Sequence, residues 1–366
     1  MRAATSPIQR PRDARLLAVD AQGLIRDLAR TQLASLFEAG DVLIANDAAT
    51  LPASLAGRHE RSGAPIEVRL AGRRSLRGSD VRAFTAVVFG AGDHRLRTED
   101  RPAPPPLEPG DALQLGPVRA QVHRRLNHPR LVEIGFEGPI DAVWAGLAAH
   151  GRPIQYAHVT QPLALWDVWT PIAARAVAFE PPSAAFALDW ALLDNLRTRG
   201  VAFHTLTHAA GLSSTGDPAL DARLPFDEAY EVPAATVEAI TRTRRDGGRV
   251  IAVGTTVARA LEHAGSSPRP LHAGPGLATQ RLGSQTQLRV VDAIVSGTHE
   301  VGTSHHALLR AFVDADRLAR IDAALERGSY RTHEFGDSVW LERDPALHAA
   351  ARPSADAARE PEPEAA

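Results

Sequence analysis

The feature that most constrains the fold is a β-rich block set inside a chain that otherwise alternates strands and helices. Between residues 58 and 138 the sequence consists of short, mostly alternating segments such as IEVRL, VRAFTAVVF and LVEIGF, separated by glycine or proline. Several short strands at this spacing favour a small β-barrel or sandwich. Apolar strand-like runs and helical stretches precede and follow the block, as is typical of α/β domains.

This order predicts an insertion rather than two domains in series. We expect an α/β fold in which a barrel-like α/β main domain carries an inserted small β-barrel domain. The main domain is expected to be discontinuous and to comprise residues 1–57 and 139–344, with the barrel at 58–138. The tail, residues 345–366, ends in PEPEAA and is expected to be disordered.

Composition excludes several kinds of chemistry. The 366 residues include neither cysteine nor lysine, which rules out thiolate nucleophiles, cysteine-ligated metals and Schiff-base lysines. A formal net charge of −2 at pH 7 gives no overall basic field for nucleic acid, so any such contact requires a local patch. No secretory signal or apolar run of the ~20 residues that span a bilayer is present. We therefore expect a cytoplasmic protein without a membrane partner.

The segment RVIAVGTTVARALE, residues 249–262, contains a candidate anion site. A predicted strand runs into Gly254, and Thr255 and Thr256 open a predicted helix that they can cap. Free amides at the start of a helix receive carboxylates or phosphates, and Arg259 lies about one turn further along with its fork of donors. An ordinary strand–turn–helix connection explains the same pattern.

Histidines gather in two segments, HTLTH at 204–208 and HEVGTSHH at 299–306. Two such clusters raise the hypothesis of a metal site. Their spacing matches no standard motif and HExxH is absent, so we expect no metal. A single histidine acting as general base is the favoured interpretation, with His208 and His299 as candidates.

Two further groups of residues could bind a ligand. Asn46 and Asp47 end the apolar run DVLIAND, and ligands gather at the carboxyl ends of strands in α/β folds. Capping of the next segment would explain them equally well. Arg73, Arg74 and Arg77 lie in an arginine-rich stretch that could meet phosphates, although a solvated face of the barrel explains it as well.

Several segments, in order over residues 11–341, resemble one family. They are PRDARLLAVD, DVLIANDAATLPASLAG, EAYEVPAATVEAI, RVIAVGTTVARALE, LRVVDAIVSGTHEVGTSHHALLRAF and YRTHEFGDSVWL. The family that they resemble is S-adenosylmethionine:tRNA ribosyltransferase-isomerase, which acts in queuosine biosynthesis. The resemblance implies a barrel-like α/β domain that carries a small β-barrel.

The resemblance also implies a tRNA modification activity. Such a transferase-isomerase moves the ribosyl part of S-adenosylmethionine onto 7-aminomethyl-7-deazaguanine in tRNA, which gives epoxyqueuosine and releases adenine and methionine. S-adenosylmethionine would be the ribosyl donor and tRNA the partner, and the chemistry needs no metal. His299 or His208 would be the base, oriented by Glu228. Five residues would bind the donor: Asn46, Asp47, Thr255, Thr256 and Arg259. Arg73, Arg74 and Arg77 would meet tRNA.

The loops expected to meet substrate depart from the family's segments. Ala49 and Ser54 stand where NDTRVIPARL has arginines. Phe226 and Asp227 stand where HSE has His and Ser, and Gly302 replaces the arginine of NFHLPRS. These differences leave open a paralogue that acts on another substrate, or a non-catalytic relative that keeps the fold and binds a nucleoside or RNA. An unrelated histidine-dependent metal hydrolase is a more distant alternative.

Overall fold

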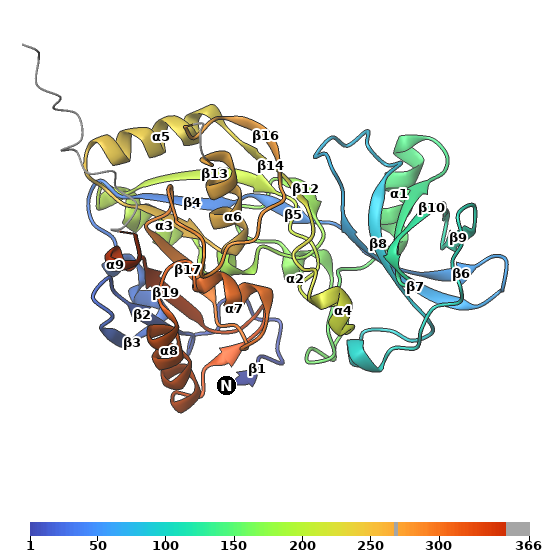
Figure 1. The fold of residues 1–366 in the computed structure, drawn as a ribbon, viewed down its shortest axis with the longest axis horizontal. Helices are drawn as coiled ribbons and strands as arrows, with labels where there is room; N and C mark the ends of the chain where they lie inside the picture. The colour runs from blue at the N-terminus through green and yellow to red at the C-terminus, as the bar shows by residue number, and fades with distance from the viewer. Residues whose placement is uncertain (267–269, 349–366) are drawn as a thin grey trace, which may run out of the picture.

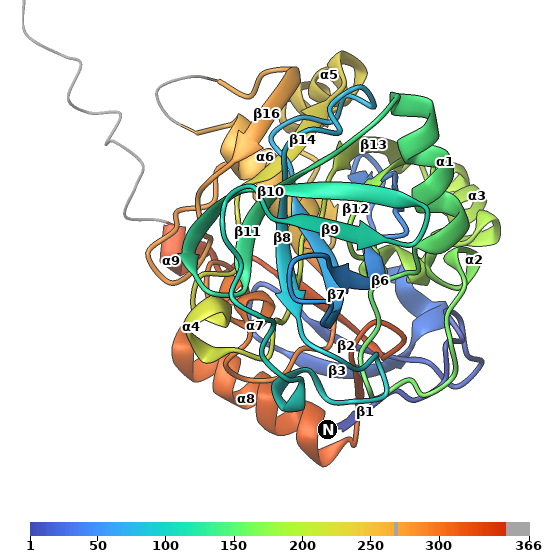
Figure 2. The same cartoon turned by 90° about the vertical axis from the view of Figure 1, so that its right-hand side faces the viewer.

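The computed structural model describes residues 1–266 and 270–348, and it confirms the predicted α/β class (Figure 1). In this part of the chain, nine strands form one sheet, here called the main sheet, and six other strands close into a barrel beside it. Figure 2 looks onto the barrel, with the main sheet and its helices behind it. The predicted small β-barrel is therefore confirmed.

The barrel has the strand order β10-β11-β8-β7-β6-β9, and all neighbouring strands are antiparallel. Its strands are β6 (Ser54–His59), β7 (Pro65–Gly72), β8 (Phe84–Phe89), β9 (Ala112–Leu115), β10 (Val118–His128) and β11 (Leu131–Phe136). The turn η2 (Thr98–Asp100) lies between β8 and β9, and α1 (Ile140–His150) follows β11. The division of the chain into domains at residues 58 and 138 stays a prediction.

The chain enters and leaves the barrel at one place. Ser54, where β6 begins, and Arg152, just after α1, form an isolated antiparallel bridge. The amide of each donates to the carbonyl of the other at 2.9 Å. The barrel is therefore connected to the rest of the protein through two chain segments that hydrogen-bond to each other.

The main sheet has the strand order β16-β14-β13-β4-β15-β17-β19-β2-β3. Its strands are β2 (Arg15–Val19), β3 (Ile25–Ala29), β4 (Val42–Asn46), β13 (Ala202–His208), β14 (Glu228–Val232), β15 (Val250–Val253), β16 (Gly274–Ala278), β17 (Ala293–Gly297) and β19 (Ser338–Glu342). The central strands β13, β4, β15 and β17 are parallel. Their carboxyl ends lie at one edge, where α/β sheets usually bind ligands.

Helices cover both faces of the main sheet. One face packs against α5 (Ala234–Arg245), α6 (Thr255–Ala264), α7 (Ser304–Leu309) and α8 (Ala315–Arg327). The other packs against η1 (Arg30–Leu36), η3 (Ser183–Ala187) and α3 (Trp190–Thr198). Within residues 1–266 and 270–348, none of the helices combines the length and hydrophobicity that crossing a bilayer requires.

Short elements complete the described chain. They are β1 (Arg2–Ala3), β5 (Ala48–Thr50), β12 (Arg175–Ala178), β18 (Arg331–Thr332), α2 (Leu165–Val168), α4 (Pro218–Asp221) and α9 (Pro345–His348). β1 pairs with β18 and β5 pairs with β12. The tail predicted to be disordered begins with the helix α9, and its residues 349–366 lie outside the described residues.

Alternation along the strands divides the apolar residues between two cores. In β4, Val42 and Ile44 belong to the core under α5 and α6. Leu43 and Ala45 belong to the core on the opposite face. Successive side chains of a strand point to opposite faces, so a strand covered on both sides reads as a continuous apolar run. This explains why DVLIAND and RVIAV, both predicted as strands, contain no polar alternation.

A buried ionic cluster joins the barrel strands to the β8–β9 connection. Glu67 on β7 is 5% exposed and accepts hydrogen bonds from Arg69 Nε at 2.7 Å and Ser54 Oγ at 2.8 Å. Its other oxygen pairs with Arg101. Burial acts to raise the pKa of Glu67, but the two guanidinium groups outweigh it and the pKa is lowered. The carboxylate is therefore charged, and both buried guanidinium groups pair with it.

We expect Glu67→Gln to lower the free energy of unfolding by about 3–5 kcal/mol, because it leaves buried guanidinium groups without their counter-charge. Urea denaturation followed by circular dichroism measures this. The matched control is Glu133→Gln, which removes a carboxylate paired at 2.8 Å with the exposed Arg124 and should cost less than about 1 kcal/mol. Equal losses in the two variants would contradict the expectation.

Candidate active site

A cavity of about 860 Å³, here called the cavity, lies at the carboxyl ends of β15 and β17. The loops that follow β12 and β13 also line it. Thr98 and Glu99 of η2 contribute to its wall, so the β8–β9 connection of the barrel takes part in the enclosure. A cavity of this volume accommodates a cofactor-sized molecule.

The start of α6 forms one wall of the cavity. Gly254 is the N-cap residue, with φ +91°, a conformation that favours glycine. Thr255 and Thr256 are the first helical residues and also line the cavity. Among the described residues no side chain caps this helix, so the prediction that the threonines cap it is wrong. The first amides of a helix lack intrahelical acceptors, and this wall therefore offers hydrogen-bond donors to an anion.

Arg259 lines the cavity, but its guanidinium group donates hydrogen bonds to other groups of the protein. Its Nη1 pairs with Glu228, and its Nε donates to the Gln280 carbonyl at 2.9 Å. Its Nη2 donates to the carbonyls of Phe226 at 2.9 Å and Ala278 at 2.8 Å. These contacts do not favour binding of an external anion by Arg259, which stays a prediction. The guanidinium instead fastens α6 to β14 and β16.

His208 and Glu228 are neighbours, as the predicted orienting contact requires. His208 Nε2 lies 3.4 Å from Glu228 Oε2. Burial lowers the pKa of His208 to about 4, with Glu228 opposing this effect and Arg259 adding to it. Glu228 lines the cavity, but the side chain of His208 is fully buried and does not belong to its described lining. This placement favours a packing role for His208 over that of a base.

Asn46 and Asp47 are not among the described residues that line the cavity. The Asn46 amide donates to the His208 carbonyl at 2.9 Å and accepts from the His208 amide at 2.9 Å. Asp47 accepts hydrogen bonds from the hydroxyls of Thr205 at 2.9 Å and Thr207 at 2.6 Å. Both side chains thus tie the end of β4 to β13, and their predicted contact with a ligand stays a prediction that these bonds do not favour.

His299 lies at the cavity, as a base would require. Its Nε2 is 2.9 Å from Ser296 Oγ, and its ring stacks on that of His305. Burial lowers the pKa of His299 well below its ordinary value, and the neighbouring imidazoles add to the effect. The ring is therefore neutral at neutral pH and able to accept a proton. Ser296, rather than Glu228, makes the orienting contact.

Glu180 and Tyr156 form a second titratable pair at the cavity, which the sequence analysis missed. The Tyr156 hydroxyl donates to one Glu180 oxygen, and the Ser213 amide donates to the other at 3.1 Å. Burial raises the pKa of Glu180 to about 7, which suits a general acid or base at neutral pH. The available signal was that Glu180 ends the apolar run AVAF, much as Asn46 ends VLIA.

His158, His333 and Glu334 also meet at the cavity wall and were missed. One signal for two of them was present in the sequence. The tripeptide Thr-His-Glu occurs twice, at residues 298–300 and 332–334. The structure brings the two copies together, since His333 Nε2 lies 3.4 Å from Glu300 Oε1.

The arginine-rich stretch is only partly available to a partner. Arg73 is 3% exposed and lies over the rings of Phe84 and Trp144. Burial lowers its pKa to about 10. Arg74 and Arg77 are exposed. The prediction that all three arginines meet RNA is corrected for Arg73, whose burial removes it from the surface.

Comparison with known proteins identifies the family. The family model described as "Queuosine biosynthesis protein" matches residues 1–341. The chain belongs to this family. The match extends over the segments that carried the resemblance, which is confirmed, and it removes the alternative of an unrelated metal hydrolase.

Relatives in this family match over most of their length. The S-adenosylmethionine:tRNA ribosyltransferase-isomerase of Novosphingobium aromaticivorans is 31% identical over 343 residues, which cover 91% of this chain and 94% of that protein. The protein of the same name from Thiobacillus denitrificans is 31% identical over 335 residues, with 90% of each chain covered. The crystal structure of S-adenosylmethionine tRNA ribosyltransferase from Thermotoga maritima aligns over 92% of this chain and 95% of its own, with 21% identity and a TM-score of 0.48.

The buried His208 predicts a measurable dependence of stability on pH. The folded protein binds a proton on this ring only below about pH 4, whereas the unfolded chain does so below its ordinary 6.5. Stability is therefore lost as the pH falls from 6.5 towards 4, by about 3 kcal/mol. His208→Gln should remove this part of the pH dependence in urea denaturation series. The exposed His123→Gln is the control, and an equal effect of both variants would contradict the assignment.

Proposed function

We propose that the chain is an S-adenosylmethionine:tRNA ribosyltransferase-isomerase that forms epoxyqueuosine from 7-aminomethyl-7-deazaguanine in tRNA. The observation that carries the proposal is the cavity itself. It gathers free helix amides at Thr255 and Thr256, a neutral imidazole at His299 and a carboxyl of raised pKa at Glu180. Family membership and the names of relatives with 31% identity support the same reaction.

The start of α6 is the part of the cavity best suited to the donor's carboxylate. S-adenosylmethionine carries an α-carboxylate, and the free amides of Thr255 and Thr256 are donors of the required kind. Their hydroxyl groups add two further polar atoms. Asn46, Asp47 and Arg259 are left out of this proposal because their side chains are bonded elsewhere.

His299 is the proposed base. The reaction begins when a proton leaves the carbon beside the sulfonium, and a neutral imidazole can accept it. In the tautomer whose Nε2–H donates to Ser296 Oγ, Nδ1 keeps its lone pair and can accept the proton. Because the ring remains neutral at neutral pH, no prior deprotonation is needed.

Glu180 is the proposed acid. Adenine leaves the ribose as its bond to the sugar breaks, and a proton delivered to the base makes it a better leaving group. A carboxyl with a pKa of about 7 is about half protonated at neutral pH. The Tyr156 hydroxyl and the Ser213 amide hold this carboxyl in place.

The proposed acid predicts a pH profile. Because the pKa of Glu180 is raised to about 7, its acid form is lost as the pH rises through 7, and kcat for adenine release should fall above that value. Glu180→Gln should lower kcat by about 10²–10⁴-fold and remove this limb of the profile. Adenine released from S-adenosylmethionine and precursor-bearing tRNA is measured between about pH 6 and pH 9. Glu38→Gln, at an exposed carboxylate, is the control.

The same assay tests the function as a whole. No adenine release, together with undetectable binding of S-adenosylmethionine by calorimetry, would contradict the proposed reaction. Binding without release on this tRNA would favour the alternative that the chain uses another acceptor. A persistent alkaline limb in Glu180→Gln would contradict only the role of Glu180.

We further propose that Arg74 and Arg77 contact tRNA phosphates. Both are exposed beside the barrel strand β7. Charge reversal at both positions should weaken tRNA binding. It should also reduce the slope of log K against log salt by about 1–2, because binding of the variant neutralises fewer phosphates and so releases fewer counterions. Fluorescence anisotropy at several salt concentrations measures this. Arg320→Glu, at an exposed position of α8, is the control, and an unchanged slope in the Arg74/Arg77 variant would remove these residues from the interface.

A further inference from the structure

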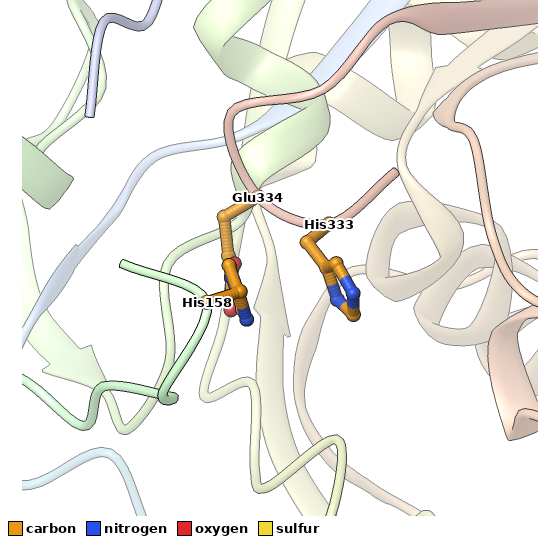
Figure 3. Close-up of side chains that lie close together, drawn as sticks. All are labelled: His158, His333 and Glu334. Carbon is orange, nitrogen blue, oxygen red and sulfur yellow. The ribbon is translucent and has the colours of Figure 1, made fainter. Parts of the chain in front are cut away.

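His158, His333 and Glu334 bring three potential metal ligands to one wall of the cavity (Figure 3). One ligand atom from each lies within 4.8 Å of the other two. His158 Nε2 is 2.9 Å from Glu334 Oε2, and the two imidazole rings stack with centroids 4.1 Å apart. The side chains are between 13% and 34% exposed, so the group is accessible from the cavity but shielded from bulk solvent.

Two distant segments supply this group. His158 comes from the loop before α2, and His333 and Glu334 directly follow β18. His333 has φ +69°, a conformation that is uncommon for residues other than glycine. Successive side chains of extended backbone point to opposite sides. The left-handed turn at His333 breaks this alternation and lets both side chains reach His158.

The fold maintains this turn. The Gly336 amide donates to the His333 carbonyl at 3.0 Å. The Asp337 carboxylate accepts from the amides of Arg331 at 2.8 Å and Arg15 at 2.9 Å. Unusual backbone conformations persist where the surroundings hold them, and they gather at functional sites. The backbone at His333 and Glu334 is therefore held by contacts that do not involve His158.

Ion pairs account for part of this arrangement, because Glu334 lies 2.9 Å from His158 and Glu300 lies 3.4 Å from His333. Each pair needs a protonated histidine, however, and the two stacked imidazoles would repel each other if both were protonated. Two neutral histidine nitrogens with one carboxylate are, by contrast, a common ligand set for zinc and for non-haem iron. Glu300, 3.4 Å from His333, brings a second carboxylate close to the same group.

We propose that His158, His333 and Glu334 bind a divalent transition-metal ion at the cavity wall. Ligand atoms lie about 2.0–2.2 Å from zinc, so binding would draw the three groups closer than 4.8 Å, a distance within reach of side-chain rotations. An ion with three protein ligands keeps open coordination positions, which oxygen or nitrogen atoms of a molecule in the cavity would occupy. The proposal departs from our expectation of no metal and does not depend on the proposed ribosyl transfer.

Metal binding can be tested without any activity assay. The full chain is treated with a chelator, dialysed and titrated with Zn²⁺ in a calorimeter and with Co²⁺ by visible absorption. We expect one ion per chain. His158→Ala, His333→Ala and Glu334→Gln should each weaken binding by more than about 100-fold, because even loss of a residue that only supports a metal ligand costs 10–100-fold.

The control is His128→Ala, which removes an imidazole paired with Asp217 at 3.3 Å outside the cavity and should leave the affinity unchanged. Thermal melting establishes that each variant is folded, and Glu334→Gln carries the test if a histidine variant is not. Absence of stoichiometric binding to the wild-type chain would overturn the proposal. So would wild-type affinity in the folded variants, since the ion would then be held elsewhere.

Discussion

The buried ion pair between Arg259 and Glu228 holds the cavity wall together. Arg259 also donates hydrogen bonds to backbone carbonyls near β14 and on β16, and Glu228 accepts a hydrogen bond from the Gly211 amide at 2.6 Å. The start of α6, the start of β14 and the loop after β13 are therefore fixed relative to one another. Burial of two charges is costly unless they are paired and hydrogen-bonded. The free amides at Thr255 and Thr256 keep their direction because this pair keeps α6 in place.

Much of the fold could be predicted from the sequence because its signals are local. Runs such as VLIA and VIAV, together with the change of pattern at the barrel, reflect which faces of a strand are covered. Side-chain partners are not local. Asn46 ends a strand at the expected edge, yet it bonds to the backbone at His208, on a strand more than 150 residues away. Nothing within the run DVLIAND indicates which way its amide turns.

The same limit explains why the cavity was only partly predicted. His299, predicted as a candidate base from its histidine-rich segment, lies in it. Tyr156 and His158 come from an irregular segment, where no periodicity indicates direction, whereas Glu180 closely follows the end of β12. Their chemistry also depends on burial, which raises the pKa of Glu180. Burial results from the packing of distant segments, so it cannot be assigned before the fold is known.

Ser54 and Arg152 are paired directly, so a tight turn could join them and the chain could be closed without the barrel. Its packing is a different matter. One continuous core contains barrel residues together with Val177, Phe179 and Ala209 of the other part, and the rings of Phe84 and Phe179 meet edge to face. A chain without the barrel would keep the connectivity of the main sheet. It would, however, expose the apolar surface that now packs against the barrel, and it would lose the part of the cavity wall that η2 provides. The barrel is thus tied to the cavity in two ways, by the core that it shares with the main sheet and by the wall that η2 contributes.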